Sequence, residues 1–181
     1  MKHVLRLLLC LSLLVPLLAE SETAKWIKRV EKTAAEMEEM ATDEGTIEVL
    51  SLYPSNYSVP PNGEALSKFH LYPILGRSKV ADAAEKKEIL TALAKSIRAS
   101  IPKDCEGVGS FACFNPRHGI IYTKKETKLE LLICFECEKV HSYDGKQERP
   151  VAGFPVKSEI GPDVFNAFLD KHKVERNALK K

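Results

Sequence analysis

Cysteine and histidine side chains gather in one segment of this chain, CFNPRHGIIYTKKETKLELLICFECEKV, residues 113–140. It holds Cys113, His118, Cys134 and Cys137, with the spacings Cys-x4-His and Cys-x2-Cys. Thiol sulfur and imidazole nitrogen can form disulfides, ligate a metal ion, or act as nucleophile and base. These four residues are therefore the first candidates for a site.

A β-hairpin is expected to bring the four residues together. The segments GIIYT and KLELLICFE have strand composition, and the polar KKET between them predicts a turn at Lys125-Glu126. If Thr123 faces Lys128, then Cys134 faces Arg117, next to His118. Opposed residues of an antiparallel pair lie about 4.5–5.5 Å apart.

Disulfide formation is the first of three interpretations of this cluster. Without the leader, the candidates are Cys105, Cys113, Cys134 and Cys137, which allow three connectivities. Cys113 could bridge Cys134 or Cys137 across the strands, and Cys105 could pair with the cysteine that is left. In a straight strand Cys134 and Cys137 would lie roughly 10 Å apart, beyond the ~7 Å limit for a bridge.

A metal site is the second interpretation. Cys113, His118, Cys134 and Cys137 would supply four ligands that suit zinc or a copper ion. Against it, CFEC has no glycine within or directly after it that would help the backbone turn around a metal.

A thiol-dependent enzyme is the third interpretation, with Cys113 or Cys134 as nucleophile and His118 as base. Thiol-disulfide catalysis is disfavoured, because two glutamates flank the second cysteine of CFEC and no helix begins there to lower the thiol pKa. Separately, Arg117 and His118 in the turn NPRHG are candidates for binding a small anion or another ligand. The competing expectation is that Arg117 pairs with Glu130 or Glu136.

The first nineteen residues have the pattern of a secretory signal peptide. Lys2 and Arg6 precede an apolar run that ends at Ala19, and the run is shorter than the roughly 20 residues of a spanning helix. Cleavage would remove 19 residues and two of the 27 basic side chains, leaving 162 residues with 25 basic and 25 acidic side chains. We therefore expect a secreted, periplasmic or cell-envelope protein with no further transmembrane helix and no nucleic-acid partner.

The remaining pattern predicts an α+β fold: a single domain with a mainly antiparallel sheet, a C-terminal hairpin, and helices packed on one face. Helical periodicity is found at about 22–41, at 80–101 and at 161–172, and strand composition at 46–54, 69–76, 111–114 and along the hairpin. The predicted divisions are a signal peptide at 1–19, an N-terminal helix within 20–45, the α+β domain at 46–173 and a basic, solvated tail at 174–181. Asn56 matches a glycosylation pattern that has meaning only in a eukaryotic secretory route.

Three strings in the chain, FHLYPILG, ACFNPRHGI and LLICFEC, resemble a group of uncharacterised exported bacterial proteins that share CFxPRHGI and ICFEC motifs. The resemblance covers roughly residues 50–145. It implies a bacterial envelope or periplasmic setting and a single small domain, and it implies no activity. We therefore expect an exported binding or structural domain whose Cys/His cluster is held by disulfide or metal, with the thiol-dependent enzyme as the alternative.

Overall fold

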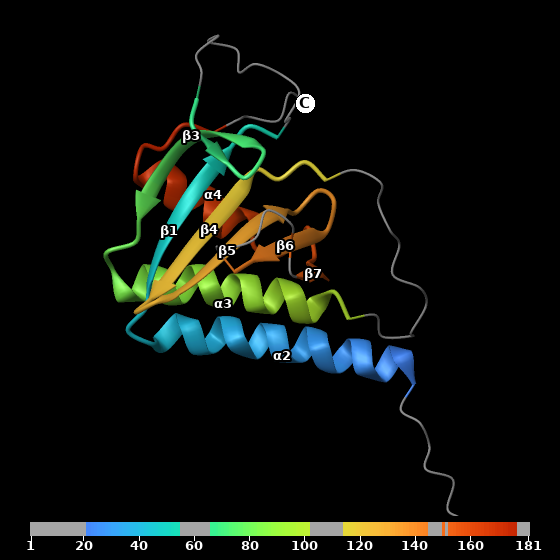
Figure 1. Cartoon of the computed structure of the whole chain (residues 1–181). Coiled ribbons are helices and arrows are strands. Elements are labelled where there is room, and N and C mark those ends of the chain that lie inside the picture. The colour runs from blue at the N-terminus through green and yellow to red at the C-terminus, as the bar shows by residue number, and fades with distance from the viewer. Residues whose placement is uncertain (1–20, 55–65, 102–113, 145–149, 151, 177–181) are drawn as a thin grey trace, which may run out of the picture.

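The computed structural model describes residues 21–54, 66–101, 114–144, 150 and 152–176. Within them lie three helices and one seven-stranded sheet (Figure 1). The elements in chain order are α2 (Glu22–Thr42), β1 (Thr46–Leu52), β2 (Lys68–Phe69), β3 (Tyr72–Lys79), α3 (Ala83–Ala99), β4 (His118–Lys124), β5 (Thr127–Cys134), β6 (Lys139–Tyr143), β7 (Ala152–Pro155) and α4 (Pro162–Lys171).

The sheet has the strand order β2-β3-β1-β4-β5-β6-β7, and every neighbouring pair is antiparallel. The predicted hairpin is confirmed, with Thr123 opposite Lys128 and His118 opposite Ile133. Lys125 makes the turn possible by adopting a φ of 53°. The expected α+β class, with its antiparallel sheet, is therefore the observed one.

The helices begin where the sequence provides caps. Ser21 accepts a hydrogen bond from Ala24 N, and Asp82 accepts from Ala84 N and Glu85 N. The helices α2 and α3 lie side by side (Figure 1). Apolar residues of all three helices join alternate residues of the sheet in one core, while a second, smaller cluster forms where β2 and β3 meet the other sheet face. The helices thus pack on one face, as predicted.

Three local predictions need correction. FHLYPILG forms two strands rather than one, β2 and β3, and the chain turns between them at His70, which has a φ of 53°. Phe114 is not in a strand, and 111–113 lie outside the described residues. In the expected tail, Val174 packs against the core and Arg176 pairs with Asp170 at 2.7 Å.

A buried charged cluster closes one end of the helix layer. Lys86, 6% exposed, donates to Asp43 Oδ1 at 2.9 Å and to the carbonyl oxygens of Asp43 and Gly45. Tyr122 donates to the other carboxylate oxygen, which Lys124 approaches to 3.1 Å. Burial alone would raise the pKa of Asp43, but the hydrogen bonds from Tyr122, Lys86 and Lys124 together bring it below its ordinary value. We call these four side chains the Asp43 cluster.

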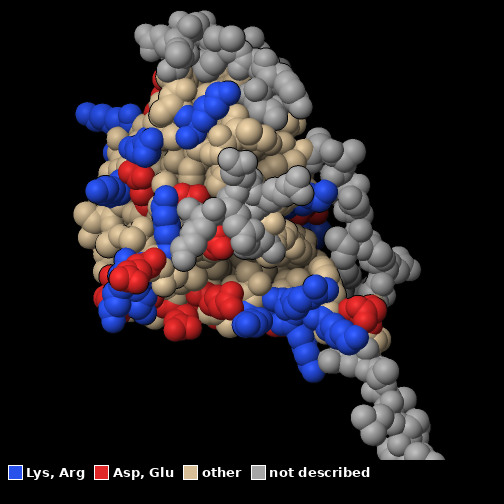
Figure 2. All heavy atoms as spheres, in the orientation of Figure 1, with Lys and Arg blue, Asp and Glu red and all other residues tan. Residues whose placement is uncertain are grey.

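Charge is distributed unevenly along α2. Figure 2 shows a group of basic side chains over its N-terminal part, with an acidic group beside them at the right-hand end, and acidic side chains along the middle of the lower edge. In the part of the chain that the structure describes, no helix is both long enough and apolar enough to cross a membrane.

Candidate functional site

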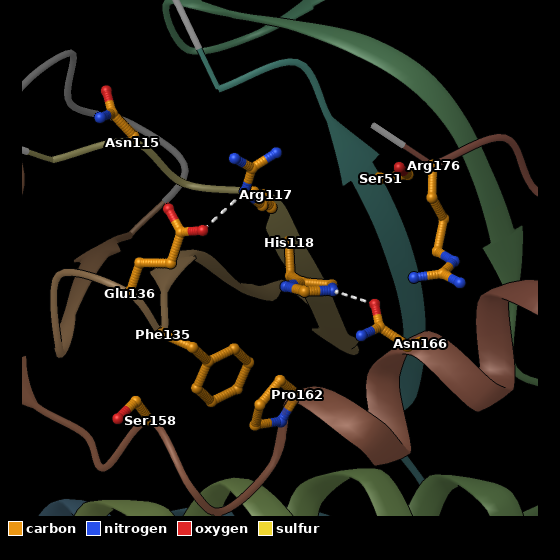
Figure 3. Close-up of a pocket in the computed structure, with 10 residues that line it drawn as sticks. All are labelled: Ser51, Asn115, Arg117, His118, Phe135, Glu136, Ser158, Pro162, Asn166 and Arg176. Atoms are coloured by element: carbon orange, nitrogen blue, oxygen red, sulfur yellow. Dashed lines mark hydrogen bonds and ion pairs between the residues drawn. The ribbon is translucent and has the colours of Figure 1, made fainter. Parts of the chain in front are cut away.

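A pocket of about 260 Å³ opens where β1 ends and β4 begins (Figure 3). Its walls come from five parts of the fold: the end of β1 with the start of β4, the segment before β4, the turn between β5 and β6, the loop before α4, and α4 with the residues after it. The lining residues are Ser51, Asn115, Arg117, His118, Phe135, Glu136, Ser158, Pro162, Asn166 and Arg176. We call this cavity the Arg117 pocket.

His118 forms the buried side of the pocket. It is 6% exposed and sits opposite Ser51, itself 2% exposed, in the β1–β4 pair. Its Nε2 lies 3.1 Å from Asn166 Oδ1, and its ring packs edge-on against Phe135 and Phe165, with centroids 5.6 and 5.4 Å away. Since an amide oxygen only accepts, Nε2 carries the proton and Nδ1 is left as an acceptor.

The environment of His118 keeps its ring neutral. Burial lowers the pKa of His118 to about 4, and the nearby charges of Arg176 and Arg117 act in the same direction, while the hydrogen bond with Asn166 opposes the shift. The imidazole is therefore uncharged at neutral pH. Positive charge in the pocket comes from the two arginines.

The rim of the pocket carries two arginines, and each has a carboxylate partner: Glu136 for Arg117, and Asp170, outside the lining, for Arg176. Arg117 Nε lies 3.5 Å from Glu136 Oε1, so the expected pairing of Arg117 with Glu136 is observed, whereas Glu130 contacts His70 and Lys128 instead. Figure 3 shows Arg117 and Arg176 on two sides of His118. Of the charged side chains that line the cavity, two are cations and one is a carboxylate.

A disulfide holds the wall that carries Phe135 and Glu136. Cys134 and Cys137 are bonded to each other, with Cα atoms 5.2 Å apart and both residues at most 2% exposed. The straight-strand argument against this pair was wrong, because β5 ends at Cys134 and the chain turns before β6. The turn is closed by Glu138 N donating to Phe135 O at 3.1 Å.

A non-glycine residue provides the backbone conformation that this turn requires. Glu138 has a φ of 49°, and its carboxylate accepts from the backbone N and the hydroxyl of Ser158 at 3.3 and 3.2 Å. These contacts compensate for a conformation that L-residues adopt rarely. Sequence reasoning looked for a glycine here and therefore missed the turn.

Gly161 fixes how α4 meets the same wall. It has a φ of 110°, and a Cβ built there would lie 2.8 Å from the Phe135 ring. Glycine is therefore required twice, for the backbone angle and for the close approach of the ring. Pro162 follows at the first helical position, and α4 then places Asn166 against His118.

The predicted site residues divide into two groups. Arg117 and His118 line the pocket, and the Cys134–Cys137 bond lies behind its wall, with Asn115 N 3.4 Å from Cys137 Sγ. Cys105 and Cys113 lie outside the described residues, as does Asn56. Among the described residues the structure thus assigns one disulfide, and its partners were not the ones expected.

The bonded sulfurs bear on the metal and enzyme hypotheses. A disulfide sulfur is neither a thiolate ligand nor a nucleophile, so Cys134 and Cys137 have no thiolate to offer in this state. Among the described residues, no group of three or more His, Cys, Asp and Glu side chains is placed to hold a metal ion. Cys113 lies outside the described residues, so the set of Cys113, His118, Cys134 and Cys137 stays a prediction.

Comparison with known proteins gives one structural likeness. A scan against models of protein families and a search of curated proteins both find no match. The fold is similar to a crystal structure described as "Putative Lipoprotein from Clostridium perfringens", with 16% identity over 86% of this chain and 98% of that chain and a TM-score of 0.41.

Four polar pocket residues from distant parts of the chain were missed by sequence reasoning. Ser51, Ser158, Asn166 and Arg176 lie far along the chain from the NPRHG turn, and nothing in their local pattern differs from an ordinary strand, loop, helix or tail. They come close to His118 only because β1 pairs with β4 in the sheet and because α4 packs against the start of β4. Arg176 was assigned to the solvated tail.

Proposed function

We propose that this chain is an exported bacterial binding domain whose Arg117 pocket holds a small anionic ligand. The observation that carries the proposal is the composition of the cavity: two guanidinium groups and one carboxylate at the rim of a pocket of about 260 Å³ with a buried, polar floor. Guanidinium groups bind carboxylates and phosphates through paired, charge-assisted hydrogen bonds.

The ion pair of Arg117 is compatible with ligand binding. At 3.5 Å, the distance from Nε to Glu136 Oε1 is longer than the 2.7–2.9 Å that is typical of a charge-assisted hydrogen bond. The Glu136 side chain is 44% exposed, so the pair gains little from a low dielectric environment. An incoming anion can therefore share the Arg117 guanidinium at modest cost.

The rigid wall beside the rim also supports a binding role. The Cys134–Cys137 bond closes the turn that presents Phe135 and Glu136, and Gly161 and Glu138 fix its position. Preorganised walls reduce the entropy that a ligand loses on binding. In this reading the cysteines are structural, and they shape the pocket instead of reacting in it.

The leader sequence and the resemblance to exported bacterial proteins support the cellular setting. A disulfide in the described structure fits an oxidising compartment outside the cytoplasm. Two of the three strings that carry the resemblance, ACFNPRHGI and LLICFEC, contribute Asn115, Arg117, His118, Phe135 and Glu136 to one cavity. We therefore propose that the same binding role accounts for both motifs.

Titration with small anions tests the proposal. The mature chain, starting at Glu20 and with its disulfides intact, is titrated with butyrate and with inorganic phosphate while backbone amide signals are followed by NMR. We expect the signals of Arg117, Glu136 and Asn166 to shift, with dissociation constants that rise as salt screens the arginines. An absence of shifts at these residues up to about 50 mM of either anion, well above the millimolar range of weak ligands, contradicts the proposal.

A matched pair of variants identifies the cation. Arg117→Gln should weaken binding by about ten-fold, which is the contribution of one charge-assisted hydrogen bond. Arg77→Gln is the control, because Arg77 makes an ion pair of similar length, 3.6 Å to Glu48, and does not line the pocket. Equal losses in the two variants would mean that general charge, and not the pocket, attracts the anion.

A further inference from the structure

One buried polar atom beside the Arg117 pocket has no hydrogen-bond partner among the described residues. Nδ1 of His118 makes no hydrogen bond within the described residues, although the residue is 6% exposed and the opposite nitrogen contacts Asn166. In Figure 3 this nitrogen points away from Asn166, toward the side of the pocket that carries Phe135. A buried polar atom without a partner destabilises the folded chain, so its presence beside a cavity requires an explanation.

The chemistry of this atom restricts what can bind it. Nε2 holds the proton that is donated to Asn166 Oδ1, so Nδ1 presents a lone pair and must be met by a donor. An ammonium group would be repelled by Arg117 and Arg176, which lie on two sides of the ring. A neutral hydroxyl avoids that repulsion, and it can also accept a hydrogen bond from the hydroxyl of Ser51, which lines the same cavity.

We propose that the ligand of the Arg117 pocket is a small hydroxylated organic anion, whose hydroxyl donates to His118 Nδ1 while its anionic group contacts the rim arginines. The inference rests on the proposed anion-binding function and assigns its ligand class. The Phe135 ring provides an apolar surface for the carbon chain between the two polar ends. At about 260 Å³ the cavity lies just below the usual range of roughly 300–1,000 Å³ for ligand pockets, which limits the ligand to a few carbon atoms.

Matched ligands isolate the hydroxyl. The mature, oxidised chain is titrated with 4-hydroxybutyrate and butyrate, and separately with 3-hydroxypropyl phosphate and propyl phosphate. Within each pair we expect the hydroxylated anion to bind about five-fold more tightly, the factor that one net neutral hydrogen bond provides. Comparison between the pairs shows whether the anionic group is a carboxylate or a phosphate.

Two readouts locate the effect at His118. The ¹⁵N signal of Nδ1 should shift when a hydroxylated anion binds and stay in place when its parent anion binds. In His118→Phe, which keeps an aromatic ring among Phe135 and Phe165, the hydroxylated anion should bind no more tightly than its parent anion. The NMR readout uses the unmodified protein, so the test stands even if the variant fails to fold.

The outcomes separate the two proposals. If both members of each pair bind with equal affinity, or if the hydroxylated anion binds more tightly without moving the Nδ1 signal, the ligand class is wrong and the anion pocket stands. If none of the four anions binds, the proposed function itself is overturned. Tighter binding together with a shifted Nδ1 signal supports both.

Discussion

Two buried polar clusters lie at opposite ends of the same two strands. β1 and β4 are antiparallel, with Thr46 opposite Thr123 at one end and Ser51 opposite His118 at the other. The Asp43 cluster reaches the first end through Gly45 and Tyr122. The Arg117 pocket occupies the second end.

The clusters differ in how well their polar groups are satisfied. Asp43 receives hydrogen bonds from Lys86, Tyr122 and Gly45 N and an ion pair from Lys124, so its charge is balanced within the fold. In the pocket, Arg117 is paired with Glu136 only at 3.5 Å, and within the described residues Nδ1 of His118 lacks a hydrogen-bond partner. The polar groups of the Asp43 cluster thus have partners within the fold, and we call this the complete end. The Arg117 pocket, the incomplete end, leaves a polar atom without a partner, which a ligand can supply.

The largest predicted loss of stability comes from replacing Lys86, the buried cation of the Asp43 cluster. Lys86→Met leaves the Asp43 carboxylate buried without its nearest ammonium group, and we expect a loss of about 3–5 kcal/mol in the free energy of unfolding, measured by urea denaturation. Lys87→Met is the matched control, because Lys87 is the exposed neighbour on the same helix. Similar losses in the two variants would show that the cluster adds no stability.

The burial of His118 in the Arg117 pocket should make the stability of the protein depend on pH. The pKa of His118 is about 4 in the folded chain and near 6.5 when unfolded, so the unfolded state binds more protons between these values. The stabilisation is complete above pH 6.5 and is lost as the pH falls toward 4, by about 3 kcal/mol. Urea midpoints at pH 7 and pH 4.5 measure it.

The matching variant for this titration is His118→Phe. Two other histidines, His70 and His141, also have lowered pKa values because of burial, so the wild-type curve alone is not specific. His118→Phe should lose most of the wild-type slope between pH 7 and 4.5. A variant with the full slope would place the titration elsewhere.

The packing of α4 against the disulfide-bonded turn gives a smaller effect. Gly161→Ala places a methyl group against the Phe135 ring at a φ of 110°, and we expect a loss of about 2 kcal/mol together with weaker anion binding. The control is Gly153→Ala, where the new Cβ would meet its nearest neighbour, His141, at an ordinary 3.5 Å. If both alanine variants unfold at the same urea concentration, the close approach to Phe135 is not required.

Removal of the disulfide should have the smallest effect on stability. Its loop is far shorter than the fifteen-residue loop expected to contribute ~3 kcal/mol, so the double change Cys134→Ser and Cys137→Ser should cost about 1–2 kcal/mol. Hydrogen exchange should speed up at Phe135 and Glu136 and remain unchanged at Gly45, in the complete end. Faster exchange at both ends would contradict the separation of the two clusters.

The hairpin shows what sequence patterns could predict. The turn at Lys125-Glu126, with Thr123 placed opposite Lys128, defined the register, and the structure has the expected partners from Lys124 back to His118. Such pairing depends on local sequence, because a two-residue turn leaves few alternative registers. Arg117 and His118 were therefore correctly placed at one end of the hairpin.

The rest of the site depends on contacts that no local pattern encodes. The CFEC turn needs Glu138 in a left-handed conformation, and this is stabilised by Ser158, twenty residues later. Asn166 reaches His118 only because Gly161 directs α4 against Phe135. Both features depend on contacts between residues far apart in the sequence, which stabilise backbone conformations that are locally unfavourable. Sequence periodicity does not reveal such contacts.

The dimensions of the sheet have a consequence for the behaviour of the protein in concentrated solution. Its outermost strands, β2 and β7, span two and four residues, whereas the strands between them are five to eight residues long. A short border offers another chain few unpaired amide and carbonyl groups in a row, which limits edge-to-edge association and fibril growth. β7 covers β6 from Lys139 to Ser142, so this border of the described sheet offers little of the long, unpaired edge that self-association needs.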